Sequence, residues 1–146
     1  RCEADIEEWG YKFHMNDVCA TVGIENLKHA DEIIEKHKSN AKFYDENLKD
    51  VEGLTLLKRE NGFDSSFWIY SVLVNDRDKF YKHMGDHGIA VSQVHERNDK
   101  HTCVREFVCS LPNLDKTIGK MVSIPVGWWV TPEDRQYIVD TIKKGW

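Results

Sequence analysis

Residues 30–48, ADEIIEKHKSNAKFYDENL, carry the clearest periodic pattern in the chain. The apolar side chains recur every three or four residues, and one histidine shares their spacing: Ala30, Ile33, Ile34, His37, Ala41, Tyr44 and Leu48. Positions spaced in this way form one stripe on an α-helix, and the lysines and glutamates fall on the opposite side. We therefore predict a helix over residues 30–48 that buries the stripe in a core.

A shorter helix is predicted just before it, over residues 17–27. Asn16 is a favourable N-cap, and Asp17 places a negative charge at the positive end of the helix dipole. Cys19 lies among the apolar residues of this helix, so we expect its thiol to be a small buried side chain.

The rest of the chain alternates predicted strands with short helices. Residues 66–74, SFWIYSVLV, are aromatic and β-branched, as expected of a central strand. Further strands are predicted over residues 54–57, 89–95 and 121–124, and short helices over residues 77–84, 102–108 and 113–119. A last helix begins at Thr131 as N-cap, followed by a proline and two acids.

This order of elements predicts an α+β fold with a mixed or antiparallel sheet that helices cover on one face. It differs from the regular alternation of a doubly wound nucleotide-binding domain, and the sequence has no glycine-rich phosphate loop. No linker or repeat interrupts it, so we expect a single domain over residues 1–146.

Composition narrows the class of protein further. The 146 residues include 20 Lys and Arg against 25 Asp and Glu, a net charge of −5, without a basic stripe that would follow a nucleic-acid backbone. No apolar run approaches the roughly 20 residues of a membrane span. The four cysteines are too few and too scattered for a disulfide scaffold. We therefore expect a globular protein of the reducing cytoplasm that binds neither nucleic acid nor membrane.

The polar run at residues 94–101, VHERNDKH, is the first candidate for a functional site. It directly follows a predicted strand, and functional residues concentrate on loops that a rigid scaffold holds. His95 could exchange a proton near neutral pH, and Arg97 could bind an anionic group. The alternative is a solvated loop in which Asn98 and Asp99 only cap the next helix. We favour the functional interpretation.

The same region suggests a metal site, which we do not favour. His95, His101, Cys103 and Cys109 are residue types that bind zinc. Their spacing matches no common zinc framework, so reduced structural thiols are the better interpretation.

Two further segments leave their alternatives open. In residues 10–17, Lys12 and His14 could face an anion at a helix N-terminus, or the segment could be a surface strand. Residues 127–129, Gly-Trp-Trp, could cap the core, line a pocket or cover an interface. No serine lies in a nucleophile-elbow motif, so the residues alone do not indicate an enzyme.

Three segments together resemble a known family. Residues 10–27, GYKFHMNDVCATVGIENL, are similar to its G-Y-N-Y-R-M-…-A-A-x-G-L-x-Q-L stretch. Residues 87–95, HGIAVSQVH, and residues 124–134, IPVGWWVTPED, follow in the family's order. The family is DegT/DnrJ/EryC1/StrS, whose members are pyridoxal-phosphate-dependent aminotransferases that act on nucleotide-linked keto sugars.

The resemblance implies the small C-terminal domain of an aspartate-aminotransferase-like, fold type I architecture. Residues 16–146 would form this domain, and residues 1–15 would be an interface or linker segment after a large domain. The lysine that binds the cofactor covalently would belong to that large domain. Because the chain begins at Arg1 within a polar pattern, we expect a piece of a longer enzyme that is inactive alone and binds pyridoxal phosphate weakly.

The resemblance also implies roles for individual residues. Lys12 and His14 match the N-Y-R positions that reach a neighbouring subunit's cofactor phosphate and substrate, which implies a homodimer. Both depart from the family's usual residues, and His14 is the poorer substitute. The pocket for the sugar substrate would include these residues: His95, Arg97, Asn98, His101 and Trp68.

By the same resemblance, the parent enzyme would take an amino group from a donor such as glutamate onto pyridoxal phosphate. It would then pass that group to a ketone carbon of a nucleotide-activated sugar. Two other hypotheses stay open at this point: a stand-alone α+β binding module without catalysis, and a zinc-stabilised interaction domain.

Overall fold

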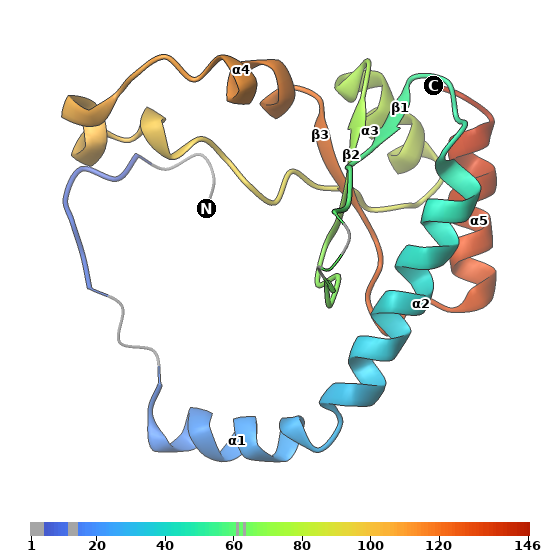
Figure 1. Ribbon diagram of the computed structural model, residues 1–146, viewed down its shortest axis with the longest axis horizontal. Helices are drawn as coiled ribbons and strands as arrows, with labels where there is room; N and C mark the ends of the chain where they lie inside the picture. The colour runs from blue at the N-terminus through green and yellow to red at the C-terminus, as the bar shows by residue number, and fades with distance from the viewer. Residues whose placement is uncertain (1–4, 12–14, 61, 63) are drawn as a thin grey trace.

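A computed structural model describes residues 5–11, 15–60, 62 and 64–146. The elements in chain order are α1 (Asp17–Leu27), α2 (Ala30–Leu48), β1 (Leu54–Leu56), β2 (Tyr70–Val74), α3 (Arg77–Asp86), the 3₁₀ turns η1 (Asn98–Lys100) and η2 (Thr102–Phe107), α4 (Pro112–Ile118), β3 (Met121–Ile124) and α5 (Pro132–Lys143). The fold is α+β, as predicted, with one small sheet and helices (Figure 1).

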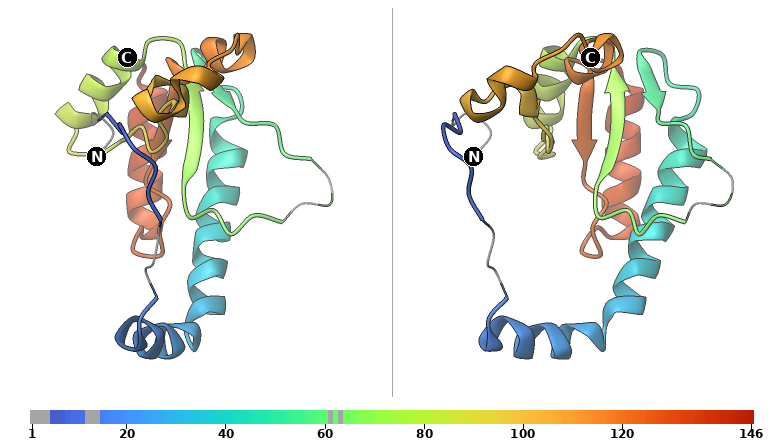
Figure 2. Two further views of the ribbon diagram at one scale, coloured as in Figure 1. Left: turned by 90° about the vertical axis from the view of Figure 1, so that its left-hand side faces the viewer. Right: turned by 60° about the vertical axis from the view of Figure 1, so that its left-hand side comes forward.

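The sheet is fully antiparallel and has the strand order β1-β2-β3. Helices α2 and α5 lie together against one of its faces (Figure 2). Alternate residues of β2 point to this covered face and are buried: Tyr70, Val72 and Val74. On the other face, Ser71 pairs with Ser123, and their hydroxyl oxygens are 3.0 Å apart.

Helix α2 begins and ends where the periodic pattern predicts. The C-terminal part of its stripe is buried: His37 is 9% exposed, and Ala41, Tyr44 and Leu48 are fully buried. Ile33 and Ile34 are only partly covered, because they lie near the end of α2 that extends beyond the sheet (Figure 1). The helix therefore supplies much of the core from its C-terminal half.

Two of the predicted strands are corrected. The strand predicted over residues 89–95 is wrong: this segment forms only an isolated bridge between Ser92 and Ser123. Its partner β3 ends at Ile124, and Pro125 has no N–H with which to extend a ladder. The strand predicted over residues 66–74 is shorter than expected, because Phe67 has a left-handed backbone with φ of 50°.

Helix boundaries elsewhere differ by a few residues from the predictions. The helix predicted over residues 77–84 continues to Asp86, and the one predicted over residues 102–108 is a 3₁₀ turn. The predicted start of the last helix is confirmed. Thr131 accepts a hydrogen bond from the Asp134 backbone, and the Asp134 carboxylate accepts one from Thr131, which forms a capping box.

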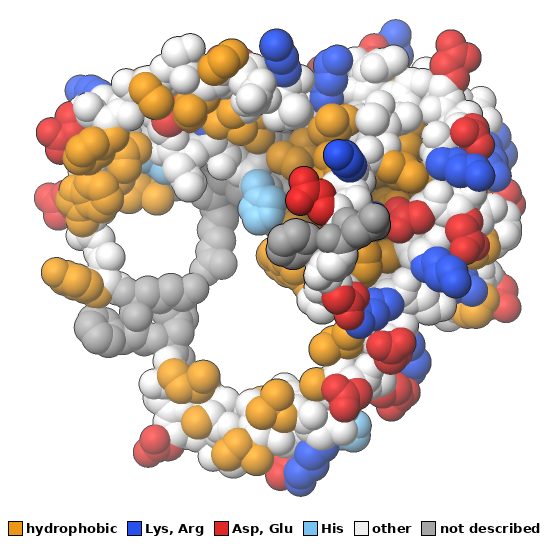
Figure 3. Space-filling model, viewed as in Figure 1, with side chains coloured by type: hydrophobic (Ala, Val, Ile, Leu, Met, Phe, Trp, Pro, Cys, Tyr) orange, Lys and Arg blue, Asp and Glu red, His pale blue; other side chains and the backbone are white. Residues whose placement is uncertain are grey.

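Helix α1 has the predicted bounds, and Asn16 caps it by accepting a hydrogen bond from the Cys19 N–H at 2.9 Å. The prediction that Cys19 is buried is wrong, since it is exposed. No residue of α1 is buried, and four of its apolar side chains are more than half exposed: Val18, Val22, Ile24 and Leu27. Figure 3 shows apolar side chains, in orange, along this helix.

The described part of the N-terminal segment lies against η2, almost a hundred residues further along the chain (Figure 1). The Asp5 carboxylate accepts hydrogen bonds from the Thr102 N–H and hydroxyl, at 2.9 and 2.6 Å. The Cys103 N–H donates to the Ile6 carbonyl, and the Trp9 ring meets the Phe107 ring edge-to-face. His101, the N-cap residue of η2, provides no side-chain acceptor, and the Asp5 carboxylate accepts from the first N–H of η2 instead.

One buried amide ties α2 to the loop between β3 and α5. The Asn40 side chain is 4% exposed, and its Nδ2 lies 3.2–3.3 Å from the backbone carbonyls of Val126, Gly127 and Val130. Its Oδ1 accepts a hydrogen bond from the Arg135 guanidinium of α5 at 3.2 Å. Asn40 therefore connects α2, the 125–130 loop and α5 at one point.

We predict that Asn40→Ala destabilises the domain by about 2 kcal/mol, because it leaves buried carbonyls and the guanidinium without their partner. Urea unfolding followed by circular dichroism measures this. Asn47→Ala is the matched control: the Asn47 amide donates only to the Phe43 carbonyl of its own helix, so a change below about 0.5 kcal/mol is expected. Equal losses in the two variants would contradict the role given to Asn40.

Candidate functional site

A groove of about 310 Å³ lies where the start of β2, the 89–95 segment and the loop after β3 meet. It is lined by Trp68, Ile69, Ala90, Ser92, Val94, Ser123, Ile124, Pro125, Val126, Gly127 and Trp129. None of these described lining residues is charged. This volume is at the lower end of the range for small-ligand sites, about 300–1,000 Å³.

Two of the residues predicted for the substrate pocket meet at the edge of this groove. The Trp68 indole is 67% exposed, and its ring centre is 6.3 Å from that of His95 in an edge-to-face arrangement. His95 does not end a strand, as we expected, but it does follow the bridge residue Ser92 that fixes its segment beside β3. The structure thus brings Trp68 and His95 together from positions far apart in the sequence.

The conformation before Trp68 is held by His37 of α2. Phe67 has a positive φ, which costs a non-glycine residue free energy. The His37 imidazole lies with Nδ1 2.9 Å from the Phe67 carbonyl, so the tautomer with hydrogen on Nδ1 donates to it. Because His37 is buried, this contact fixes the backbone from which Trp68 extends.

A second contact holds the same loop from the other side. The Arg59 guanidinium forms two hydrogen bonds with the Asp45 carboxylate, at 2.8 and 3.1 Å, and covers the rings of Phe67 and Tyr70. The Tyr70 hydroxyl donates to the Asp45 carboxylate at 2.6 Å. Burial of the hydroxyl is the larger cause, and this hydrogen bond the next, of a raised pKa of Tyr70. The tyrosine therefore stays neutral and acts as a structural donor.

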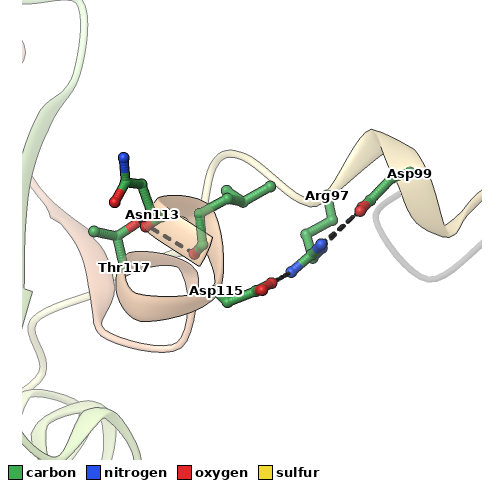
Figure 4. A network of polar contacts seen from close by, with 6 residues as sticks. Arg97, Asp99, Asn113, Asp115 and Thr117 are labelled. Carbon is green, nitrogen blue, oxygen red and sulfur yellow. Dashed lines mark hydrogen bonds and ion pairs between the residues drawn. The ribbon is translucent and has the colours of Figure 1, made fainter. Parts of the chain in front are cut away.

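The Arg97 guanidinium is hydrogen-bonded to two carboxylates. Its Nε and Nη2 donate to Asp99 at 2.8 and 2.5 Å, and its Nη1 donates to Asp115 of α4 (Figure 4). These contacts raise the pKa of Arg97 and lower that of Asp99. In this arrangement Arg97 joins η1 to α4, and its charge is already paired.

The other predicted site residues lie further along the same segment. Asn98 is exposed, and its backbone carbonyl accepts from the His101 N–H. His101 is partly buried beside the N-terminal segment, with Nδ1 3.9 Å from an Asp5 carboxylate oxygen. Lys12 and His14 lie outside the described residues. The structure therefore groups Trp68 with His95, and places Arg97, Asn98 and His101 along η1 and its ends.

The described residues show no metal cluster and no membrane-spanning helix. That part of the chain contains no group of three or more His, Cys, Asp or Glu side chains that could hold a metal ion. Its cysteines, Cys19, Cys103 and Cys109, are free thiols. Within the same residues no helix is both long and apolar enough to cross a membrane.

Sequence reasoning missed Asn40 and His37 as site-forming residues. His37 was assigned to the apolar stripe only by its spacing, and Asn40 lies beside that stripe as a polar residue without a motif. Gly127 carried a signal that could have been used, since a glycine before two tryptophans permits close approach of a ring to the backbone. Of the alternatives for residues 127–129, a core cap is disfavoured for Trp129, because it lines the groove and is 64% exposed.

The fold is that of the small domain of fold type I aminotransferases. It superposes on the sugar aminotransferase CalS13 from Micromonospora echinospora with a TM-score of 0.88 and 42% identity, covering 99% of this chain and 39% of that one. It superposes on AtS13 from Actinomadura melliaura with a TM-score of 0.87 and 46% identity, covering 97% and 38%.

The sequence comparisons agree with this class. A curated relative, UDP-4-amino-4,6-dideoxy-N-acetyl-beta-L-altrosamine transaminase from Campylobacter jejuni, is 23% identical over 96% of this chain and 39% of its own length. The family profile of the DegT/DnrJ/EryC1/StrS aminotransferase family matches residues 2–143. The chain belongs to this family, and it spans about two fifths of the length of the curated relatives it matches.

We predict that Asp99 stays ionised to a lower pH than an ordinary aspartate, whose pKa is about 3.9. Its hydrogen bonds with Arg97 lower its pKa in the folded state, so their stabilising contribution is complete above that value and disappears as the pH falls through the lower folded pKa. Carboxyl NMR titration of the wild type and Arg97→Gln measures the change.

In Arg97→Gln the Asp99 titration midpoint should rise toward the ordinary value. Asp134 is the internal control, because hydrogen bonds from Thr131 lower its pKa independently of Arg97. An Asp99 midpoint that does not move on removal of Arg97 would show that this ion pair does not form in solution.

Proposed function

We propose that this chain is the small domain of a pyridoxal-phosphate-dependent aminotransferase that transfers an amino group to a nucleotide-linked keto sugar. The observation that carries the proposal is the groove beside Trp68 and His95, in a chain whose family members include named sugar-nucleotide transaminases. The chain's own contribution is to bind and orient the sugar end of the substrate. Residues 16–146 are the domain, and residues 1–15 are the segment that joins it to its surroundings.

The groove residues support binding and orientation. Trp68 presents a flat apolar surface on a backbone whose preceding residue, Phe67, is held by the His37 and Arg59 contacts, and His95 adds a ring with hydrogen-bonding nitrogens. Asn98 and His101 lie further along the same segment and would contact more distant parts of the substrate. Arg97 acts by fixing that segment to α4 rather than through a free charge.

The described lining of the groove does not suit pyridoxal phosphate. No lysine or arginine is among the described residues that line the groove, so it offers neither an amino group for the cofactor's aldehyde nor a cation for its phosphate. We therefore assign the cofactor to a part of the parent enzyme other than the described groove, and we derive no step through it. Lys12 and His14 are proposed to reach the cofactor phosphate or substrate of a neighbouring subunit.

The partners proposed for the parent are an amino donor such as glutamate, the nucleotide sugar and a second identical subunit. The exposed apolar side chains of α1 support the last of these, because contiguous apolar surface of this kind marks an interaction site. The free thiols of the described cysteines agree with a reducing cytoplasm.

To test the substrate assignment, dTDP-glucose is titrated into the chain while the histidine ring signals are followed by NMR. We expect the His95 signal to shift at millimolar ligand, because its ring contacts Trp68, which lines the groove. His83 is the control, since its Nε2 contacts the Thr141 carbonyl on α5. A stand-alone module without sugar-nucleotide affinity would leave His95 unmoved, and that result would reject the proposed function.

To test association, sedimentation velocity compares the wild type with a Val18→Ser, Val22→Ser double variant. We expect the wild type to form a dimer at micromolar concentration and the variant to shift toward monomer, since both changes remove exposed apolar surface from α1. Neither side chain is buried, so folding should not change. If the two proteins have equal sedimentation coefficients, α1 is not the association surface.

A further inference from the structure

The absence of a side chain at Gly127 lets the Trp129 ring pack on the backbone of its own loop. A Cβ built on Gly127 would lie only 2.3–2.5 Å from three carbon atoms of the Trp129 ring. In this orientation the indole packs directly on the Gly127 backbone, at a distance that no other residue type would permit. The ring is 64% exposed, so it remains accessible to a ligand.

The loop that carries this ring is itself immobilised. Asn40 contacts the carbonyls of Val126, Gly127 and Val130, and the Tyr44 hydroxyl donates to the Pro125 carbonyl at 2.8 Å. Exposed aromatic side chains on loops normally retain rotational freedom, which lowers affinity because it is lost on binding. Here the contacts of Asn40 and Tyr44 hold the backbone that carries Trp129, which reduces this loss.

His37 connects Trp129 to the opposite side of the groove. Its Nδ1 contacts the carbonyl of Phe67, the residue before Trp68, and its ring meets the Trp129 indole edge-to-face with centres 6.4 Å apart. Trp68 and Trp129 line the same groove. One buried side chain on α2 thus contacts both the backbone next to one indole and the ring of the other.

The chemistry of the groove selects its occupant. The described lining is uncharged, which disfavours a phosphate. Besides apolar residues, the lining includes the hydroxyl groups of Ser92 and Ser123. A hexose ring presents C–H groups on its faces and hydroxyls around its edge. Flat indole walls suit the faces, and small hydroxyls suit the edge.

Building on the proposed function, we propose that Trp129 and Trp68 are the two walls of a site for the uncharged hexose ring of the nucleotide sugar. His37 is the positioning residue that fixes the distance between these walls. Trp129 is thereby a determinant of which sugars fit, together with Trp68.

The test uses the indole N–H signals of the ¹⁵N-labelled chain, with dTDP-glucose and dTDP as probes. We expect dTDP-glucose to shift the Trp68 and Trp129 signals, each assigned from its Trp→Phe variant, and dTDP alone to leave them in place. Trp146, which packs on Phe80, is the internal control. If dTDP alone shifts both signals equally, the groove binds the base and the proposal is overturned.

Two variants test whether the packing of the Trp129 ring on Gly127 matters for binding. Gly127→Ala should displace the Trp129 ring and weaken dTDP-glucose binding by roughly three- to tenfold. The control is Gly85→Ala, where an added Cβ on α3 meets nothing within 4 Å, and no change is expected. Trp129→Ala removes an exposed side chain and should weaken binding similarly in a chain that still folds.

Replacement of His37 separates positioning from general stability. His37→Leu should move the Trp68 and Trp129 signals of the free protein, whereas His37→Asn, which retains an N–H near the Phe67 carbonyl, should restore them. If dTDP-glucose shifts His95 while Trp129→Ala binds it as tightly as the wild type, the proposed function stands and this inference fails. If the probe shifts neither His95 nor the two indoles, both fail.

Discussion

The arrangement of this domain depends on one amide buried between two helices and a loop. A carbonyl of the 125–130 loop that is taken out of water needs a donor, and three such carbonyls converge on the Asn40 side chain. An apolar residue of the same size would fill the space but would remove this donor; the Gly127 carbonyl would keep only its hydrogen bond from the Val130 N–H. Because Arg135 donates to the other end of the same amide, the position of α5 is tied to that of the loop.

The two ends of α2 have different roles. The C-terminal half is buried against the sheet and α5, and the N-terminal end leads to α1, which has no buried residue. The domain is therefore a core with an attached helix whose apolar side chains lie outside that core.

The sequence predicted the helices better than the sheet, for a physical reason. The bounds of α1 and α2 follow from caps and from a period of three to four residues, both of which are local. The 89–95 segment has the composition of a strand, yet its pairing depends on where β3 ends, and Pro125 decides that from a distant position. The left-handed backbone of Phe67 depends likewise on His37 and Arg59, which no local pattern connects to it.

The candidate site also combines features that the sequence predicted with features that depend on distant contacts. His95 was a candidate from the polar run at residues 94–101, Trp68 only from the family resemblance, and the structure brings their rings together. Arg97 was expected to be free for an anion, but its two carboxylate partners include Asp115 from a helix that the motif does not contain. The contacts between Asp5 and Thr102 join residues 97 positions apart, so they close a very large loop for two hydrogen bonds. Because closing such a loop costs more conformational entropy than a local contact, we expect the N-terminal segment to detach before the sheet and its helices unfold.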